Sequence, residues 1–83
     1  MNENNERLFQ TSKEYPYCTV ICNTLDNFEK ILRCLQVDYI SSIEMYCILY
    51  EVMDDNGKLC LVKYYIRRDN VIILQIIPDI AIS

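Results

Sequence analysis

The sequence contains no histidine and no tryptophan, and glycine occurs once, as Gly57. Histidine is the side chain most often used for proton transfer near neutral pH, and it is the commonest metal ligand. Its absence argues against acid–base catalysis and against a histidine-ligated metal. One glycine cannot build a glycine-rich phosphate loop. We therefore expect no enzyme, no cofactor and no metal site.

Cysteine is present in an odd number without the spacing of a zinc site. The closest pair, Cys18 and Cys22, is separated by three residues, and no histidine is available to complete a ligand set. The chain starts with polar and acidic residues rather than a signal peptide, so we expect a cytoplasmic protein with reduced thiols. Buried free thiols are the simplest interpretation of the five cysteines. They are Cys18, Cys22, Cys34, Cys47 and Cys60.

Length and charge restrict the partners of the chain. Its 83 residues provide one small domain, and the net charge of −4 disfavours direct binding to nucleic acid. The longest apolar run, residues 71–77, is interrupted by Gln75 and is far shorter than the roughly 20 residues of a membrane span. Many isoleucines, asparagines and tyrosines beside a single alanine suggest an AT-rich genome, such as that of a bacterium or its phage.

The hydrophobic pattern predicts an amphipathic helix in the first half of the chain. Residues 1–14 are mainly polar and are expected to form a loosely ordered arm, followed by a single domain over residues 15–83 that starts with a strand at 17–22. Residues 25–36 then show helical spacing, with Thr24 or Asp26 as the N-cap. The apolar positions of this helix fall on one stripe: Leu25, Phe28, Ile31, Leu32 and Leu35.

The second half of the chain predicts a meander of three strands over residues 43–53, 58–67 and 71–77. Asp55-Asn56-Gly57 is a strong hairpin signal, and residues 68–70 are a weaker one. The expected fold is therefore α+β with the order β-α-β-β-β. One amphipathic helix would pack on one face of a mostly antiparallel four-stranded sheet.

Charge placement selects the register of both predicted hairpins. A three-residue first loop sets Glu51 opposite Leu61 and ends with Glu44 beside Arg68. It gathers one apolar face for the core: Tyr46, Ile48, Tyr50, Val52, Cys60, Val62, Tyr64 and Ile66. A three-residue second loop sets Gln75 beside Lys63 and adds three core residues, Ile72, Leu74 and Ile76.

The opposite face of this predicted sheet is too apolar for contact with water. Around a polar stripe of Glu51, Lys63 and Gln75 it carries Met45, Cys47, Leu49, Met53, Leu59, Leu61, Tyr65, Ile73 and Ile77. One short helix covers only one face of a sheet. Three alternatives could cover the other face: the chain's own arm and tail (Leu8, Phe9, Ile80, Ile82), a second copy, or a different protein.

These features favour a small, acidic, non-catalytic protein-binding module that uses the apolar sheet face. We expect it to be a viral protein, for example from a phage, that inhibits or redirects a host protein. One alternative is a homo-oligomeric structural or assembly subunit, with a homodimer as its simplest form. A further alternative is an acidic mimic of nucleic acid that blocks a DNA- or RNA-binding protein. No membrane partner is expected.

Overall fold

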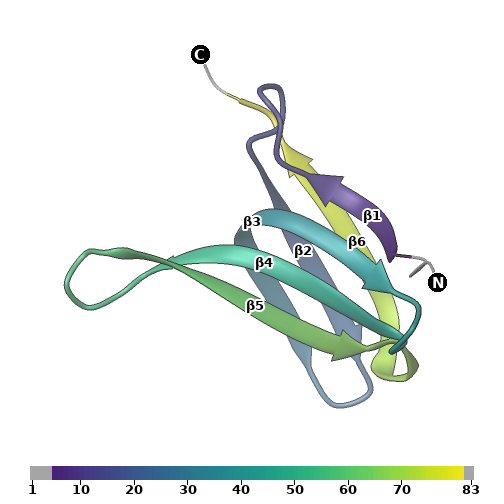
Figure 1. The fold of residues 1–83 in the computed structure, drawn as a ribbon. Helices are drawn as coiled ribbons and strands as arrows, with labels where there is room; N and C mark the ends of the chain where they lie inside the picture. The colour runs from purple at the N-terminus through teal and green to yellow at the C-terminus, as the bar shows by residue number, and fades with distance from the viewer. Residues whose placement is uncertain (1–4, 82–83) are drawn as a thin grey trace.

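The computed structural model describes residues 5–81 and is an antiparallel all-β domain (Figure 1). The only helical segment in this part of the chain is a short 3₁₀ turn, so the expected α+β fold is wrong. The elements are β1 (Asn5–Gln10), β2 (Tyr17–Thr24), β3 (Phe28–Ile40), β4 (Met45–Met53), β5 (Leu59–Arg67), η1 (Arg68–Asn70) and β6 (Val71–Asp79).

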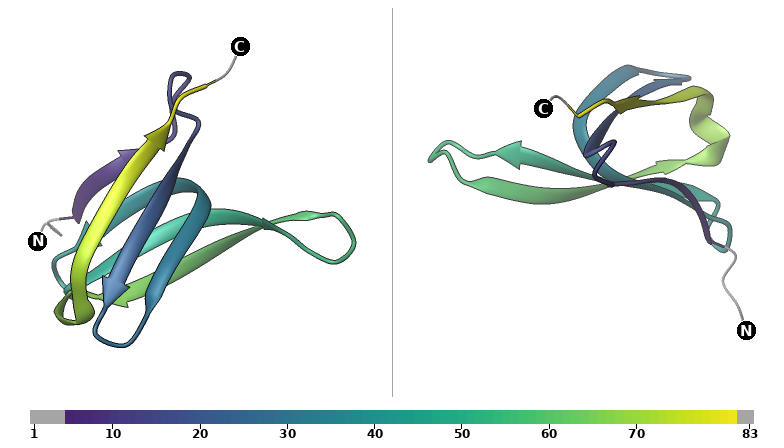
Figure 2. Two further views of the ribbon diagram at one scale, coloured as in Figure 1. Left: turned by 180° about the vertical axis from the view of Figure 1, so that it is seen from behind. Right: turned by 90° about the horizontal axis from the view of Figure 1, so that it is seen from above.

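The long strand β3 organises the sheet, whose order is β5-β4-β3-β2-β6 with β1 also paired to β3. Cys34 of β3 lies between Cys18 of β2 and Tyr50 of β4. From this point toward its start β3 follows β2, and toward its end it runs between β4 and β1. The sheet therefore curls around β3 and encloses a core between two layers of strands (Figure 2).

Two irregularities in β3 explain why its sequence has helical spacing. Ile31, Cys34 and Val37 are buried at every third position, whereas a regular strand buries every second one. Two residues of β3, Leu32 and Arg33, oppose one residue of β2, and the φ of Arg33 is 57°; a second register shift follows between Cys34 and Gln36. Each β-bulge adds one residue and so changes the inward-facing period from two to three.

The residues expected to form the buried stripe of a helix therefore do not all face the core. Leu25 and Phe28 are exposed by 70% and 64%, and Leu32 is also exposed. Thr24 caps a turn instead of a helix, because its hydroxyl accepts the NH groups of Asp26 and Asn27 at 3.3 and 2.9 Å. Local side-chain hydrogen bonds of this type compete with helix formation.

The β4–β5 hairpin has the predicted register. Glu51 lies opposite Leu61 in an unbroken ladder, and Glu44 forms an ion pair with Arg68 at 3.7 Å. Gly57 has φ of 80°, the left-handed conformation expected for its place in the turn. The Asp54 carboxylate accepts the NH groups of two turn residues at 2.9 Å each. This prediction is confirmed.

The second predicted hairpin is wrong, because β6 pairs with β2 and not with β5. Gln75 lies opposite Ile21, so the expected polar stripe of Glu51, Lys63 and Gln75 does not form. The turn η1 carries the chain from β5 to β6 without bringing the two strands into one ladder.

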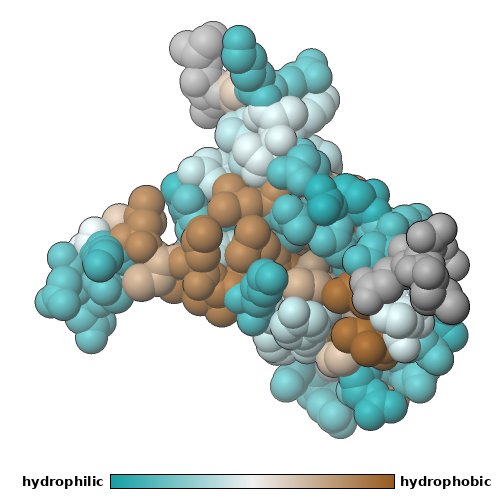
Figure 3. Space-filling view, viewed as in Figure 1, coloured by the Kyte–Doolittle hydropathy of each residue, from teal (hydrophilic) through white to brown (hydrophobic). Residues whose placement is uncertain are grey.

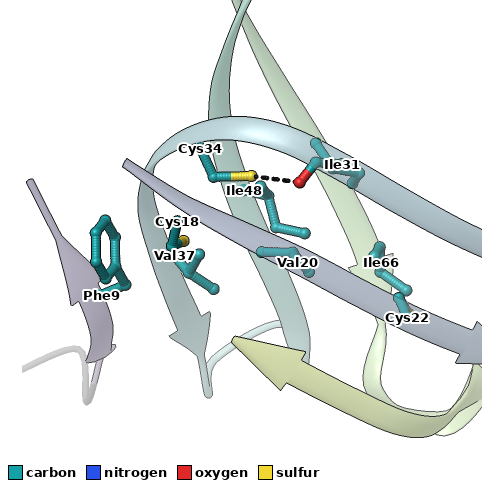
Figure 4. Close-up of a cluster of buried hydrophobic side chains, with 9 residues drawn as sticks. All are labelled: Phe9, Cys18, Val20, Cys22, Ile31, Cys34, Val37, Ile48 and Ile66. Atoms are coloured by element: carbon teal, nitrogen blue, oxygen red, sulfur yellow. Dashed lines mark hydrogen bonds between the residues drawn. The ribbon is translucent and has the colours of Figure 1, made fainter. Parts of the chain in front are cut away.

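Buried side chains from five strands fill the space inside the curled sheet (Figure 4). Phe9 comes from β1, so part of the expected loose arm forms a strand and contributes to the core. Residues 1–4 of that arm lie outside the described residues. All five cysteines are free, and four are buried, as predicted; Cys60 is half-buried. The core cluster consists of Phe9, Cys18, Val20, Cys22, Ile31, Cys34, Val37, Ile48 and Ile66.

No helix within residues 5–81 has the length and apolar character needed to cross a bilayer.

The buried position of Ile48 predicts a large effect of truncation. Ile48 has no exposed surface, whereas Ile72 is 61% exposed. Ile48→Ala should lower the free energy of unfolding by about 2–5 kcal/mol, because it leaves a cavity. The matched control Ile72→Ala should change it by less than about 0.5 kcal/mol. Denaturant unfolding of both variants measures the difference, and equal effects would contradict this core.

Candidate functional site

The outer part of the β4–β5 hairpin projects from the body of the domain (Figures 1 and 2). Pairing between β3 and β4 starts at Cys34 and Tyr50, whereas the β4–β5 ladder continues to Met53 and Leu59. Residues 51–61 therefore form a two-stranded arm with a tight turn at its tip. An isolated two-stranded hairpin is marginally stable in water. We call residues 51–61 the hairpin arm.

One side of the whole hairpin forms an apolar surface, which we call the hairpin face. The register places its members on the side away from Ile48 and the core. Met53 and Leu61 are exposed by 63% and 64%, and Leu59 and Tyr65 are about half exposed. Figure 3 shows hydrophobic surface over the front of β4 and β5. The hairpin face consists of Met45, Cys47, Leu49, Glu51, Met53, Leu59, Leu61, Lys63 and Tyr65.

The hairpin face contains nine of the twelve residues predicted as a partner-binding site. The other three, Ile73, Gln75 and Ile77, lie on β6, which is at the opposite end of the strand order. Cys47 belongs to the hairpin face by register but is buried, so it adds little to the exposed surface. The predicted site is therefore divided between two parts of the sheet.

A cleft opens where β3 and β4 separate beyond Cys34 and Tyr50. Its volume is about 390 Å³, and side chains from both strands line it. The sequence did not predict this cleft, because the helical spacing of residues 25–36 assigned one of its walls to a helix. The lining residues are Glu29, Lys30, Ile31, Leu32, Arg33, Tyr50, Glu51 and Val52.

Arg33 bridges the cleft from the β-bulge of β3. Its guanidinium donates to Glu51 Oε1 at 2.7 Å and to the Tyr17 hydroxyl at 2.8 Å, and it lies 4.3 Å from the centre of the Tyr17 ring. The hydrogen bond to Glu51 raises the pKa of Arg33, so the guanidinium stays charged. These contacts tie the base of the hairpin arm to the body of the domain.

A second polar contact joins β5 to the start of β3. The Tyr64 hydroxyl donates to Glu29 Oε2 at 2.8 Å. This hydrogen bond and partial burial raise the pKa of Tyr64. The neutral phenol is the form that donates, so the contact depends on its protonation.

Three buried cysteines in the core also have shifted pKa values. The thiolate is the form that attacks or binds a metal. A hydrogen bond with Cys34 and burial raise the pKa of Cys18, and burial raises that of Cys22. The same hydrogen bond with Cys18 lowers the pKa of Cys34, against the opposing effect of burial. Within residues 5–81, no group of three cysteine or acidic side chains is placed to hold a metal ion.

Comparisons with protein-family models, curated proteins and solved structures find no match to the chain. The expected viral origin and inhibitory role thus find no support. Function must therefore be inferred from the geometry of the hairpin.

The Tyr64–Glu29 contact predicts a loss of stability in alkaline solution. Because the folded chain raises the pKa of Tyr64, the unfolded chain ionises first, at pH about 10. The stabilising contribution is complete below that pH and is lost as the pH rises through the raised pKa. We expect the free energy of unfolding to fall more steeply in the wild type than in Tyr64→Phe over this range. Denaturant unfolding at a series of pH values measures both slopes.

The variant Glu29→Gln is the control for this experiment. It keeps the Tyr64 phenol but removes the negative charge that disfavours its ionisation. Its alkaline slope should be shallower than that of the wild type, because burial and a hydrogen bond to the neutral amide raise the pKa of Tyr64 less than the carboxylate does. Identical slopes for all three proteins would show that the contact does not control the titration.

Proposed function

We propose that this chain is a non-catalytic protein-binding module that uses the hairpin face. The observation that carries the proposal is the exposure of Met53, Leu59 and Leu61 on an arm that projects from the domain. Burial of each such side chain contributes about 1.5–3 kcal/mol. Val52 on the other side of the arm is also exposed, so the arm has apolar groups on both sides. Contact with a partner surface would remove the apolar groups on both sides of the arm from water and so stabilise the arm.

The described arm and tail of the chain support an external partner. Phe9 is buried in the core, and Ile80 is 74% exposed near the end of β6. The backbone NH of Ala81 donates to the carbonyl of Glu14 in the β1–β2 turn, which lies away from the hairpin arm (Figure 1). Ile82, the other tail residue considered for this cover, lies outside the described residues.

A polar framework around the hairpin face also fits a binding role. The Arg33–Glu51 ion pair anchors the base of the arm, while the apolar residues lie beyond it. A rigid base with an exposed apolar end limits the entropy lost on association. The cytoplasm stays the expected compartment, and the absence of catalysis stays a prediction.

Site-specific photocrosslinking tests the proposal in the cells that naturally contain the chain. A photoreactive amino acid at position 61 should give protein adducts, including adducts with another copy. The same group at position 13, in the exposed β1–β2 turn, is the matched control. Position 61 giving no more adducts than position 13 would refute binding through the hairpin face.

The substitution Leu61→Glu tests the energetic contribution of the hairpin face. It should weaken the association detected by crosslinking by about tenfold or more, because a contribution of about 1.4 kcal/mol corresponds to a factor of ten. The control Ile72→Glu places the same charge at an equally exposed position on β6. Thermal unfolding checks that both variants fold. Equal association in both variants would place the interaction elsewhere.

A further inference from the structure

The outer edge of β5 has no strand beside it in the described part of the chain. β5 pairs with β4 alone and ends the strand order, and β6 occupies the opposite end. Nine residues form this edge, without proline or an inward-pointing charge; Lys63 and Arg67 are its only charged side chains. Natural proteins usually protect such edges, because a free edge pairs readily with another strand.

Hydrogen bonds at both ends of the ladder establish which backbone groups face this edge. Asp54 donates to the carbonyl of Lys58 at 2.8 Å, and Arg68 donates to the carbonyl of Glu44 at 3.0 Å. Between these points the register is unbroken, so the even-numbered residues of β5 bond to β4. The odd-numbered residues direct their NH and C=O groups to the open edge: Leu59, Leu61, Lys63, Tyr65 and Arg67.

The residues with outward backbone groups are therefore those that carry the exposed side chains of the hairpin face. Leu59, Leu61 and Tyr65 offer apolar surface and backbone hydrogen bonds at the same positions. A strand added to this edge would satisfy the backbone and contact these side chains together. This combination is the basis of recognition by strand addition.

We propose that the added strand is β5 of a second copy, paired antiparallel about a two-fold axis at Leu61. The proposal deepens the proposed function, because it names the partner of the hairpin face. In this register Leu61 lies opposite Leu61 of the second copy, and Leu59 lies opposite Lys63, whose aliphatic stem covers it. Tyr65 of each copy lies beside the turn of the other, because the chain leaves β5 before Leu59.

Charge along the hairpin favours this antiparallel arrangement. Its tip carries Asp54, Asp55 and Lys58, whereas at the far end of β5 Arg68 is paired with Glu44 and Arg67 makes no ion pair within residues 5–81. Antiparallel pairing brings the turn of each copy to the end of β5 in the other, with Asp55 toward Arg67. A register centred on Lys63 would instead oppose two like charges, which is destabilising. A two-fold axis gives each favourable contact twice.

A charge exchange tests the pairing. Arg67→Glu and Asp55→Lys each place like charges at both ends of the dimer, so each variant alone should dimerise about tenfold more weakly than the wild type. An equimolar mixture should restore dimers, because the two substituted side chains, which have opposite charges, then meet across one end and the natural pair meets across the other. Sedimentation equilibrium measures the dissociation constants.

Both substituted side chains are exposed and make no ion pair within residues 5–81, so the variants should fold like the wild type. Thermal unfolding checks this. Single variants that dimerise like the wild type, or a mixture that fails to restore dimers, would overturn the pairing.

Amide exchange provides a second test, specific for edge pairing. In the dimer the NH groups of Leu61 and Lys63 become hydrogen-bonded, so their exchange should slow as the protein concentration rises. The NH groups of Val62 and Tyr64 are the control, since they already face β4. Dimers that leave the exchange of Leu61 and Lys63 unchanged would indicate face-to-face packing and overturn the proposal. A monomer at all concentrations would overturn it too, whereas adducts of position 61 with another protein would leave the proposed function intact.

Discussion

The fold depends on the bent backbone of β3, which bonds to three other strands. The first of its two β-bulges places Arg33 in the left-handed region, and together the two bulges let Ile31, Cys34 and Val37 all face the core. A regular strand of this length would turn Cys34 to the opposite side from Ile31 and Val37. The left-handed backbone costs about 1–2 kcal/mol. The two flanking buried residues and the contacts of Arg33 offset that cost.

The same bend creates the features of the surface. Where β3 turns to follow β2, it leaves β4, and the cleft opens between them. β4 and β5 continue together as the hairpin arm, beyond the reach of the core. Arg33 therefore has two consequences: its backbone allows the strands to separate, and its side chain holds Glu51 at the point where they do.

The proposed dimer connects the apolar surface with the charge distribution. The chain is acidic as a whole, but β5 contains Lys63 and Arg67 and no acidic residue. A hydrophobic surface alone gives little preference for orientation, because the hydrophobic effect is non-directional. The backbone groups at the open edge and the unlike charges at its two ends supply that orientation. The hairpin face would then provide affinity and the edge would provide register.

The sequence alone predicted the β4–β5 hairpin, because turn chemistry at Gly57 and alternation along both strands are local signals. It therefore also predicted most of the hairpin face. Long-range strand pairing established the conformation of residues 28–40, where β-bulges give a strand the spacing of a helix. Only the tertiary structure decided that β6 joins β2, since pairing across some fifty residues leaves no local signal. The cleft beside Arg33 depends on both of these choices and could not be foreseen.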